Sequence, residues 1–146
     1  MSKKALFLAG PLTGVSYSDA LDWRKYVESK LPADVIAFSA LRGKRHVTKE
    51  CVLKDAYPEH LLSTPQGTIT RDRYDVSRCD ALFVNFLNSD EVSIGTIMEM
   101  AWADACAYRL SSPWKKGIFT IILLCDRSRH SSPGTWTGRY ERPWMS

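Results

Sequence analysis

Glu99 is the residue of this chain whose surroundings most strongly indicate chemistry. It lies in the run Ser-Ile-Gly-Thr-Ile-Met-Glu-Met-Ala-Trp at positions 93–102, as a carboxylate among apolar neighbours. Burying an ionised group is costly, so a carboxylate in such a run is often functional. If the run is helical, the face of Glu99 carries no cation, since its members are Gly95, Thr96, Trp102 and Ala103. We therefore predict that Glu99 lines a ligand-binding cleft; the alternative is a helix residue paired with a distant cation such as Arg109.

Two further acidic residues, Asp72 and Asp75, lie in a segment that is typical of a short helix over residues 71–79. An acidic side chain beside a bound substrate can donate or relay a proton. Asp72 is therefore a candidate catalytic residue, and Asp75 is a candidate substrate contact that rivals it for the same role. The alternative for the sequence Arg-Asp-Arg at 71–73 is a solvated charge cluster or a helix cap.

Four other residues are candidate substrate contacts because they lie at or after the ends of predicted strands, and Gly95, in the same stretch as Glu99, is a further candidate. Gly10 and Pro11 form a turn whose glycine lets a ligand approach the backbone, although a turn alone explains them equally well. Asn85, near the end of a later strand, can bind a sugar or a base, but asparagine is also common in loops. Ser93 can cap the helix of Glu99, donate to a substrate, or do both.

The elements that must position these residues follow a β-α-β pattern. Apolar runs of strand length predict strands over residues 4–10, 34–40, 81–87 and 118–125. Helical spacing predicts one helix that begins near Ser18 or Asp19 and ends before Pro32, and another that runs from Ser93 to about Arg109. This order favours one α/β domain over residues 1–146 with a central parallel sheet. In such sheets ligands bind outside the carboxyl ends of the strands.

Two segments show no regular period. Residues 41–70 contain a basic stretch at 42–46 and are interrupted by Pro58, Pro65 and Gly67, so we predict a long loop there. A loop of this length in a compact domain is commonly a lid, a binding loop or an insertion that contacts a partner. The tail from about residue 126 is also irregular.

Composition excludes several protein classes. The chain has 146 residues, of which 45% are hydrophobic and 25% charged, as in ordinary globular proteins. The longest apolar stretch, residues 118–125, is far too short to span a bilayer, so we expect no membrane partner. Four widely spaced cysteines predict reduced thiols in a cytoplasmic protein without a metal site. The net charge of +4 comes from the tail, which allows contact with phosphate or nucleic acid but equally a solvated surface.

The sequence resembles the nucleoside 2-deoxyribosyltransferase family in three stretches taken in order. These are Leu-Ala-Gly-Pro-Leu at 8–12, the segment from Arg71 through Leu82, and the stretch at 93–103 with its Gly-x-x-x-Glu element at Gly95 and Glu99. The resemblance implies a flavodoxin-like, Rossmann-like three-layer fold, exchange of the base on a 2-deoxyribonucleoside, and no cofactor. It also implies that Glu99 is the nucleophile, that Asp72 lies near the base, and that the protein is a homo-oligomer.

Residue chemistry is consistent with that reaction. Cleavage of an N-glycosidic bond develops positive charge at the anomeric carbon, which a carboxylate can stabilise or capture covalently. Two alternatives stay open. A hydrolase of the same fold would use the same glutamate and admit water in place of a second base. A non-catalytic nucleotide-binding or nucleic-acid-binding module would instead use the basic residues at 42–46 and in the tail. We expect small-molecule substrates rather than nucleic acid, namely a deoxynucleoside or deoxynucleoside monophosphate and a free nucleobase.

Overall fold

The computed structural model describes residues 3–47, 52–54, 56–87, 92–106, 108–110 and 120–125. Their centre is a five-stranded sheet in the order β2-β1-β3-β5-β4. The strands are β1 (Lys4–Ala9), β2 (Val35–Ser39), β3 (Ala81–Asn85), β4 (Tyr108–Leu110) and β5 (Thr120–Cys125). The strands expected over residues 4–10, 34–40, 81–87 and 118–125 are confirmed as β1, β2, β3 and β5.

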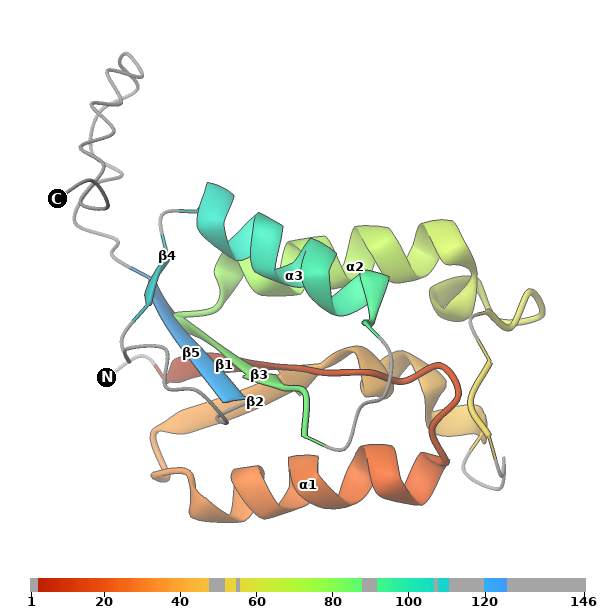
Figure 1. Cartoon of the computed structure of the whole chain (residues 1–146), viewed down its shortest axis with the longest axis horizontal. Coiled ribbons are helices and arrows are strands. Elements are labelled where there is room, and N and C mark those ends of the chain that lie inside the picture. The colour runs from red at the N-terminus through yellow and green to blue at the C-terminus, as the bar shows by residue number, and fades with distance from the viewer. Residues whose placement is uncertain are drawn as a thin grey trace, which may run out of the picture.

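Helices cover both faces of this sheet, which makes a three-layer α/β fold (Figure 1). Helix α1 (Tyr17–Lys30) lies on one face, and helices α2 (Pro65–Arg78) and α3 (Ile94–Ala105) lie together on the other. Two short 3-10 segments, η1 (Ala40–Val47) and η2 (Leu61–Ser63), join β2 to α2. Among the described residues, no helix is long and apolar enough to cross a membrane.

The sheet is parallel only in part. β1 runs parallel to β2 and to β3, with Ala9 opposite Val84 at the end of the second pair. β5 runs antiparallel to β3 and to β4, whereas we expected it to extend a parallel sheet. The reason is the short strand β4, which follows α3 and lies at the edge of the sheet. The chain then reverses, and β5 fills the position between β4 and β3.

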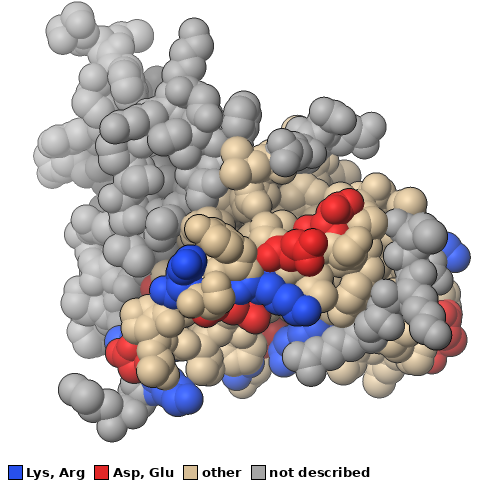
Figure 2. All heavy atoms as spheres, turned by 90° about the horizontal axis from the view of Figure 1, so that it is seen from below, with Lys and Arg blue, Asp and Glu red and all other residues tan. Residues whose placement is uncertain are grey.

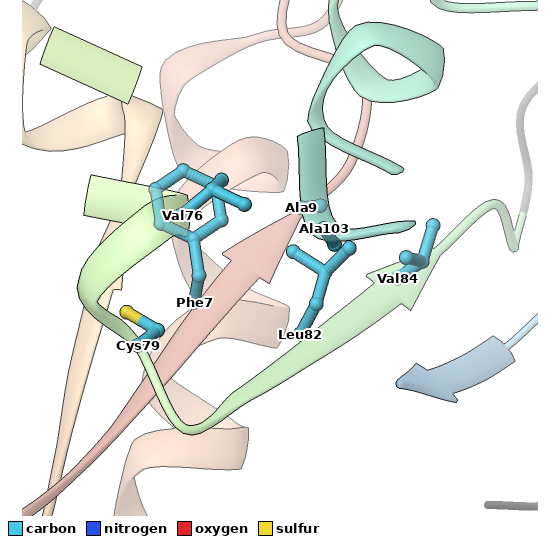
Figure 3. Packing of buried hydrophobic residues seen from close by; sticks show 7 residues of the cluster. All are labelled: Phe7, Ala9, Val76, Cys79, Leu82, Val84 and Ala103. Atoms are coloured by element: carbon cyan, nitrogen blue, oxygen red, sulfur yellow. The ribbon is translucent and has the colours of Figure 1, made fainter. Parts of the chain in front are cut away.

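Burial on both sides explains why β1 and β3 are nearly continuous apolar runs. Figure 3 shows the core between the sheet and the α2–α3 layer. It contains side chains from two strands and two helices: Phe7, Ala9, Val76, Cys79, Leu82, Val84 and Ala103. On the opposite face, Trp23 of α1 stacks on Phe83 with a distance of 6.1 Å between ring centroids. The face on the α1 side of the molecule carries acidic and basic side chains next to one another (Figure 2).

Three helix boundaries differ from those expected. Helix α1 is capped by Ser16, whose hydroxyl accepts a hydrogen bond from the Asp19 backbone, and not by Ser18 or Asp19. Helix α2 begins at Pro65, so the predicted loop at 41–70 is shorter and contains η1 and η2 as well. Helix α3 ends at Ala105 instead of Arg109, because the chain turns into β4.

The early start of α2 has a local physical cause. Thr64 caps the helix by accepting a hydrogen bond from the Gly67 backbone at 3.0 Å. Pro65 occupies the first helical position, where the missing N–H costs nothing because that group has no intrahelical acceptor. Proline and glycine, which we read as signs of a loop, here belong to the first turn of a helix.

Candidate functional site

Glu99 lies in the second turn of α3 and is 5% exposed. The helix begins where the sequence predicted, because Ser93 caps it by accepting a hydrogen bond from the Thr96 backbone at 3.3 Å. Thr96, one turn before Glu99, is also buried and donates its hydroxyl to Ser93 at 3.0 Å. The cap therefore fixes the first turns of α3, and with them the position of the Glu99 carboxyl group.

The charges around Glu99 come from other helices. Burial raises the pKa of Glu99 well above its ordinary value, and the negative charge of Asp72 raises it further. The positive charges of Arg24 on α1 and Arg71 on α2 lower this pKa, but they do not overcome burial. Among the ion pairs between described residues, none involves Glu99. Burial and the charge of Asp72 therefore favour the protonated form of Glu99.

Asp72 is the second buried carboxyl group of this cluster and is 4% exposed. Its Oδ1 accepts a hydrogen bond from Arg71 Nε at 2.9 Å and forms an ion pair with a terminal nitrogen of the same guanidinium, also at 2.9 Å. Burial raises the pKa of Asp72, while the charge of Arg71 and its hydrogen bond lower it. The pKa of Asp72 is raised overall, but Asp72 has an adjacent counter-charge in Arg71, whereas none of the described ion pairs involves Glu99.

Arg24 is the functional candidate that sequence reasoning missed. It is 2% exposed, and its terminal nitrogens donate to the carbonyl oxygens of Ala20 at 2.6 Å and Gly10 at 3.0 Å. Its Nε is buried without a hydrogen-bond partner, and burial lowers the pKa of Arg24 to about 10. The signal was available in the sequence, since Arg24 lies four residues after Ala20 and residues at this spacing share one face of a helix.

These positions bring three helices together at the carboxyl edge of the parallel strands. Gly10 follows β1 there, and Arg24 reaches it from the opposite face of the sheet. Two carboxyl groups with unequal proton affinity and a buried guanidinium are a suitable set for acid–base or covalent catalysis on a neutral substrate. This edge is also where parallel α/β sheets commonly bind ligands.

Asp75 also comes from α2, but its surroundings differ. Its side chain is 0% exposed, and its two oxygens form ion pairs with Arg42 and with Arg78, the latter at 2.9 Å. A substrate can reach this carboxylate only if one ion pair opens. Its ion pairs give Asp75 an architectural role, because they join η1 to α2, and the substrate contact that we predicted for it stays a prediction.

Gly10, Pro11 and Asn85 lie together at the ends of β1 and β3. Gly10 is buried, and a Cβ atom there would lie 2.9 Å from the Asn85 carbonyl oxygen and 3.0 Å from the Trp23 ring. Close packing of two strand ends therefore requires glycine at this position. The Asn85 side chain accepts a hydrogen bond from the Leu87 backbone at 2.9 Å and so forms the turn after β3. Pro11 is half-buried in the turn after β1.

Gly95 differs from Gly10. It is exposed in the first turn of α3, and a Cβ atom at this position would have the Ser93 hydroxyl as its nearest neighbour, at 3.9 Å. No packing constraint among the described residues requires a glycine here. Asn88, Asp90 and Glu91, which precede this turn, lie outside the described residues.

Neither a metal site among the described residues nor a similar known protein was found. Within the part of the chain that the structure describes, no three His, Cys, Asp or Glu side chains are grouped as a metal site would require. No protein-family model, curated protein or solved structure matches the chain.

Proposed function

We propose that the protein exchanges the nucleobase of 2-deoxyribonucleosides, with Glu99 as nucleophile and Asp72 as the proton donor to the leaving base. The observation that supports this function best is the buried pair itself. Two carboxyl groups on adjacent helices interact so that the charge of one raises the pKa of the other. Such a pair can catalyse the cleavage of an N-glycosidic bond, because one member stabilises the anomeric carbon and the other protonates the nitrogen.

The pair carries one proton, and its position defines the two roles. In the resting protein the proton is on Glu99, because Arg71 stabilises the anionic form of Asp72. Transfer of that proton to Asp72 generates a carboxylate and an acid together. The Glu99 carboxylate then attacks C1′, the C1′–N bond breaks, and its electron pair stays on the base nitrogen, which takes the proton from Asp72.

The second half of the reaction reverses these steps with another base. The acceptor nitrogen attacks C1′, the bond from C1′ to the Glu99 oxygen breaks, and Asp72 receives the proton from the acceptor. Two inversions at C1′ give net retention of configuration. Arg24 is placed to stabilise the Glu99 carboxylate whenever it is ionised, since its positive charge lowers the pKa of Glu99.

The proposal includes a flavodoxin-like classification of the fold and a homo-oligomeric protein. The parallel strand order β2-β1-β3, with helices on both faces, supports this classification. Chromatography coupled to light scattering tests the oligomer, because a monomeric mass at micromolar concentration would contradict it.

The decisive experiment incubates the purified protein with deoxynucleosides, with and without a free acceptor base, and separates the products by chromatography. Glu99→Gln is the test variant, because glutamine has the size of the protonated acid but cannot attack C1′. Asp104→Asn is the matched control, since Asp104 is an exposed acid on the same helix. A new nucleoside that forms only with acceptor, and only in wild type and Asp104→Asn, establishes transfer.

Other outcomes identify the alternatives. Free base that forms without acceptor, and depends on Glu99, establishes a hydrolase with the same nucleophile. Turnover that survives in Glu99→Gln contradicts the assigned mechanism. If no substrate is converted, but nucleotides bind with an affinity that falls steeply with salt, the protein is a binding module instead.

A further inference from the structure

A pocket lies between η1, η2 and α2. It has a volume of about 270 Å³ and is lined by Arg42, Gly43, Leu62 and Arg71. Two of the four described residues that line it are arginines, and none of these four is acidic. Its volume is close to the lower end of the range for small-molecule sites, so it suits a compact ligand.

Arg71 is held rigidly at the wall of this pocket. Its terminal nitrogens donate to the carbonyl oxygens of Leu62 at 2.7 Å and Ala40 at 3.0 Å, and its Nε donates to Asp72. The backbone of η1 passes so close that a Cβ atom on Gly43 would overlap the guanidinium. The Ser63 hydroxyl fixes the same backbone by donating to the Gly43 carbonyl at 2.5 Å. The guanidinium is therefore preorganised, which lowers the entropy cost of binding a ligand.

Arg42 supplies the accessible charge. Its side chain is 37% exposed and forms an ion pair with the buried Asp75, which Arg78 also contacts. Among the ion pairs of the described residues, Arg71 pairs with Asp72, and Arg42 and Arg78 both pair with Asp75. The pocket is the place where an anion can approach Arg42 and Arg71.

We infer that this pocket binds a phosphate-type oxyanion between Arg42 and Arg71. A planar guanidinium donates parallel hydrogen bonds to two oxygens of such an anion, and Arg42 retains donors beyond the one that contacts Asp75. Gly43 leaves the wall free of a side chain next to Arg71. The same Arg71 contacts Asp72, so one side chain connects the anion pocket to the proposed catalytic pair.

Binding is tested directly, with inorganic phosphate and no turnover. The wild-type protein is titrated with phosphate at constant ionic strength, with chloride as the balancing ion, and followed by calorimetry and by amide chemical shifts. We expect saturable binding in the millimolar range, with the largest shift changes at Gly43 and Leu62. Absence of saturation, or shift changes confined to other residues, overturns the inference whatever the variants do.

Two variants then test whether Arg42 supplies the positive charge that binds phosphate. Arg42→Met is expected to weaken phosphate binding at least tenfold. Arg73→Met removes the same charge from an exposed position of α2 that does not line the pocket, and is expected to change binding less than twofold. Equal losses in both variants would mean that phosphate responds only to net charge, which overturns the site. If Arg42→Met does not fold, the shift map of wild type remains the test.

A third titration identifies the source of the oxyanion. Glu99→Gln protein, in which the proposed reaction is blocked, is titrated with a deoxynucleoside 5′-monophosphate and with the deoxynucleoside that lacks the phosphate. Binding of the monophosphate at least tenfold tighter than both the nucleoside and inorganic phosphate identifies a phosphate ester. Equal affinity for monophosphate and inorganic phosphate identifies a free ion. Because these are binding measurements, failure of the proposed glycosidic activity leaves them interpretable.

Discussion

Glu99 and Asp75 are both acidic side chains buried in the same helical layer, and their surroundings are opposite. Asp75 is 0% exposed and has an arginine at each carboxylate oxygen. Glu99 is 5% exposed, and the charges that act on it come from Asp72, Arg24 and Arg71 without an ion pair to any of them. One carboxyl group is neutralised by salt bridges, and burial favours the protonated form of the other.

The contrast separates a structural acid from a reactive one. A buried carboxylate with two ion pairs links the elements that supply its partners, here η1 and α2, and removing the partners leaves an expensive charge. A buried carboxyl group without a pair costs stability once it is ionised, and such groups are concentrated at functional sites. Four predictions test this contrast, in order of decreasing expected effect.

The largest expected effect is on turnover. Glu99→Gln should lower the proposed transferase activity by about a thousandfold or more, since the nucleophile is lost. Asp75→Asn should change activity by less than about tenfold in protein that is folded, because Asp75 does not touch substrate in the proposed mechanism. Initial rates at saturating deoxynucleoside, measured on both variants, check this difference. A reversed order of the two losses would move the active site to Asp75.

The next effect is on stability at the Asp75 cluster. The double change Arg42→Met with Arg78→Met leaves a fully buried carboxylate without a counter-charge. We expect a loss of about 2–3 kcal/mol in the free energy of unfolding, the lower part of the range for buried pairs, because both arginines are partly solvated. Urea unfolding measures it, with Arg73→Met as the control for net charge. A loss no greater than that of the control would mean that the ion pairs do not stabilise the fold.

The pH dependence of stability should distinguish Glu99 from other acids. Its folded pKa lies above its unfolded value, so the folded state binds one proton more between these two values. Stability is therefore highest below the unfolded pKa of about 4.5 and falls as pH rises towards the folded pKa, by up to about 1.4 kcal/mol per pH unit. Unfolding from pH 5 to 8 should show this decline in wild type, and a shallower decline in Glu99→Gln. Parallel curves for the two proteins would contradict a raised pKa at Glu99.

The smallest expected effects concern the two glycines of the site. Gly10→Ala brings a methyl group to 2.9 Å from the Asn85 carbonyl oxygen, and we expect a loss of about 1–3 kcal/mol in unfolding free energy. Gly95→Ala meets open space in a helix and should add up to about 1 kcal/mol. Thermal unfolding checks both. A destabilised Gly95→Ala would show that this turn packs against something, and a raised KM in a stabilised variant would place substrate next to it.

Much of the fold could be predicted from the sequence, because the local sequence patterns agreed with the secondary structure. Four apolar runs of strand length became strands, and Ser93 caps α3 as its position before the apolar run predicted. The start of α2 could not be predicted in this way, since Pro65 and Gly67 are compatible both with a loop and with a first helical turn. Only the Thr64 cap and the packing of the helix against the sheet decide between them. The direction of β5 was likewise set by β4, whose three residues give no pattern of their own.

For this protein, the sequence by itself determined which carboxyl group is unusual. An acid surrounded by apolar residues at helical spacing is buried wherever the helix packs, so Glu99 could be selected without coordinates. What only the tertiary structure decided is which charges reach that acid, because Arg24, Asp72 and Arg71 come from two other helices and are separated from it by 27 or more positions in the sequence. Electrostatic interaction depends on distance in space, and these helices approach one another only because they pack against the same sheet.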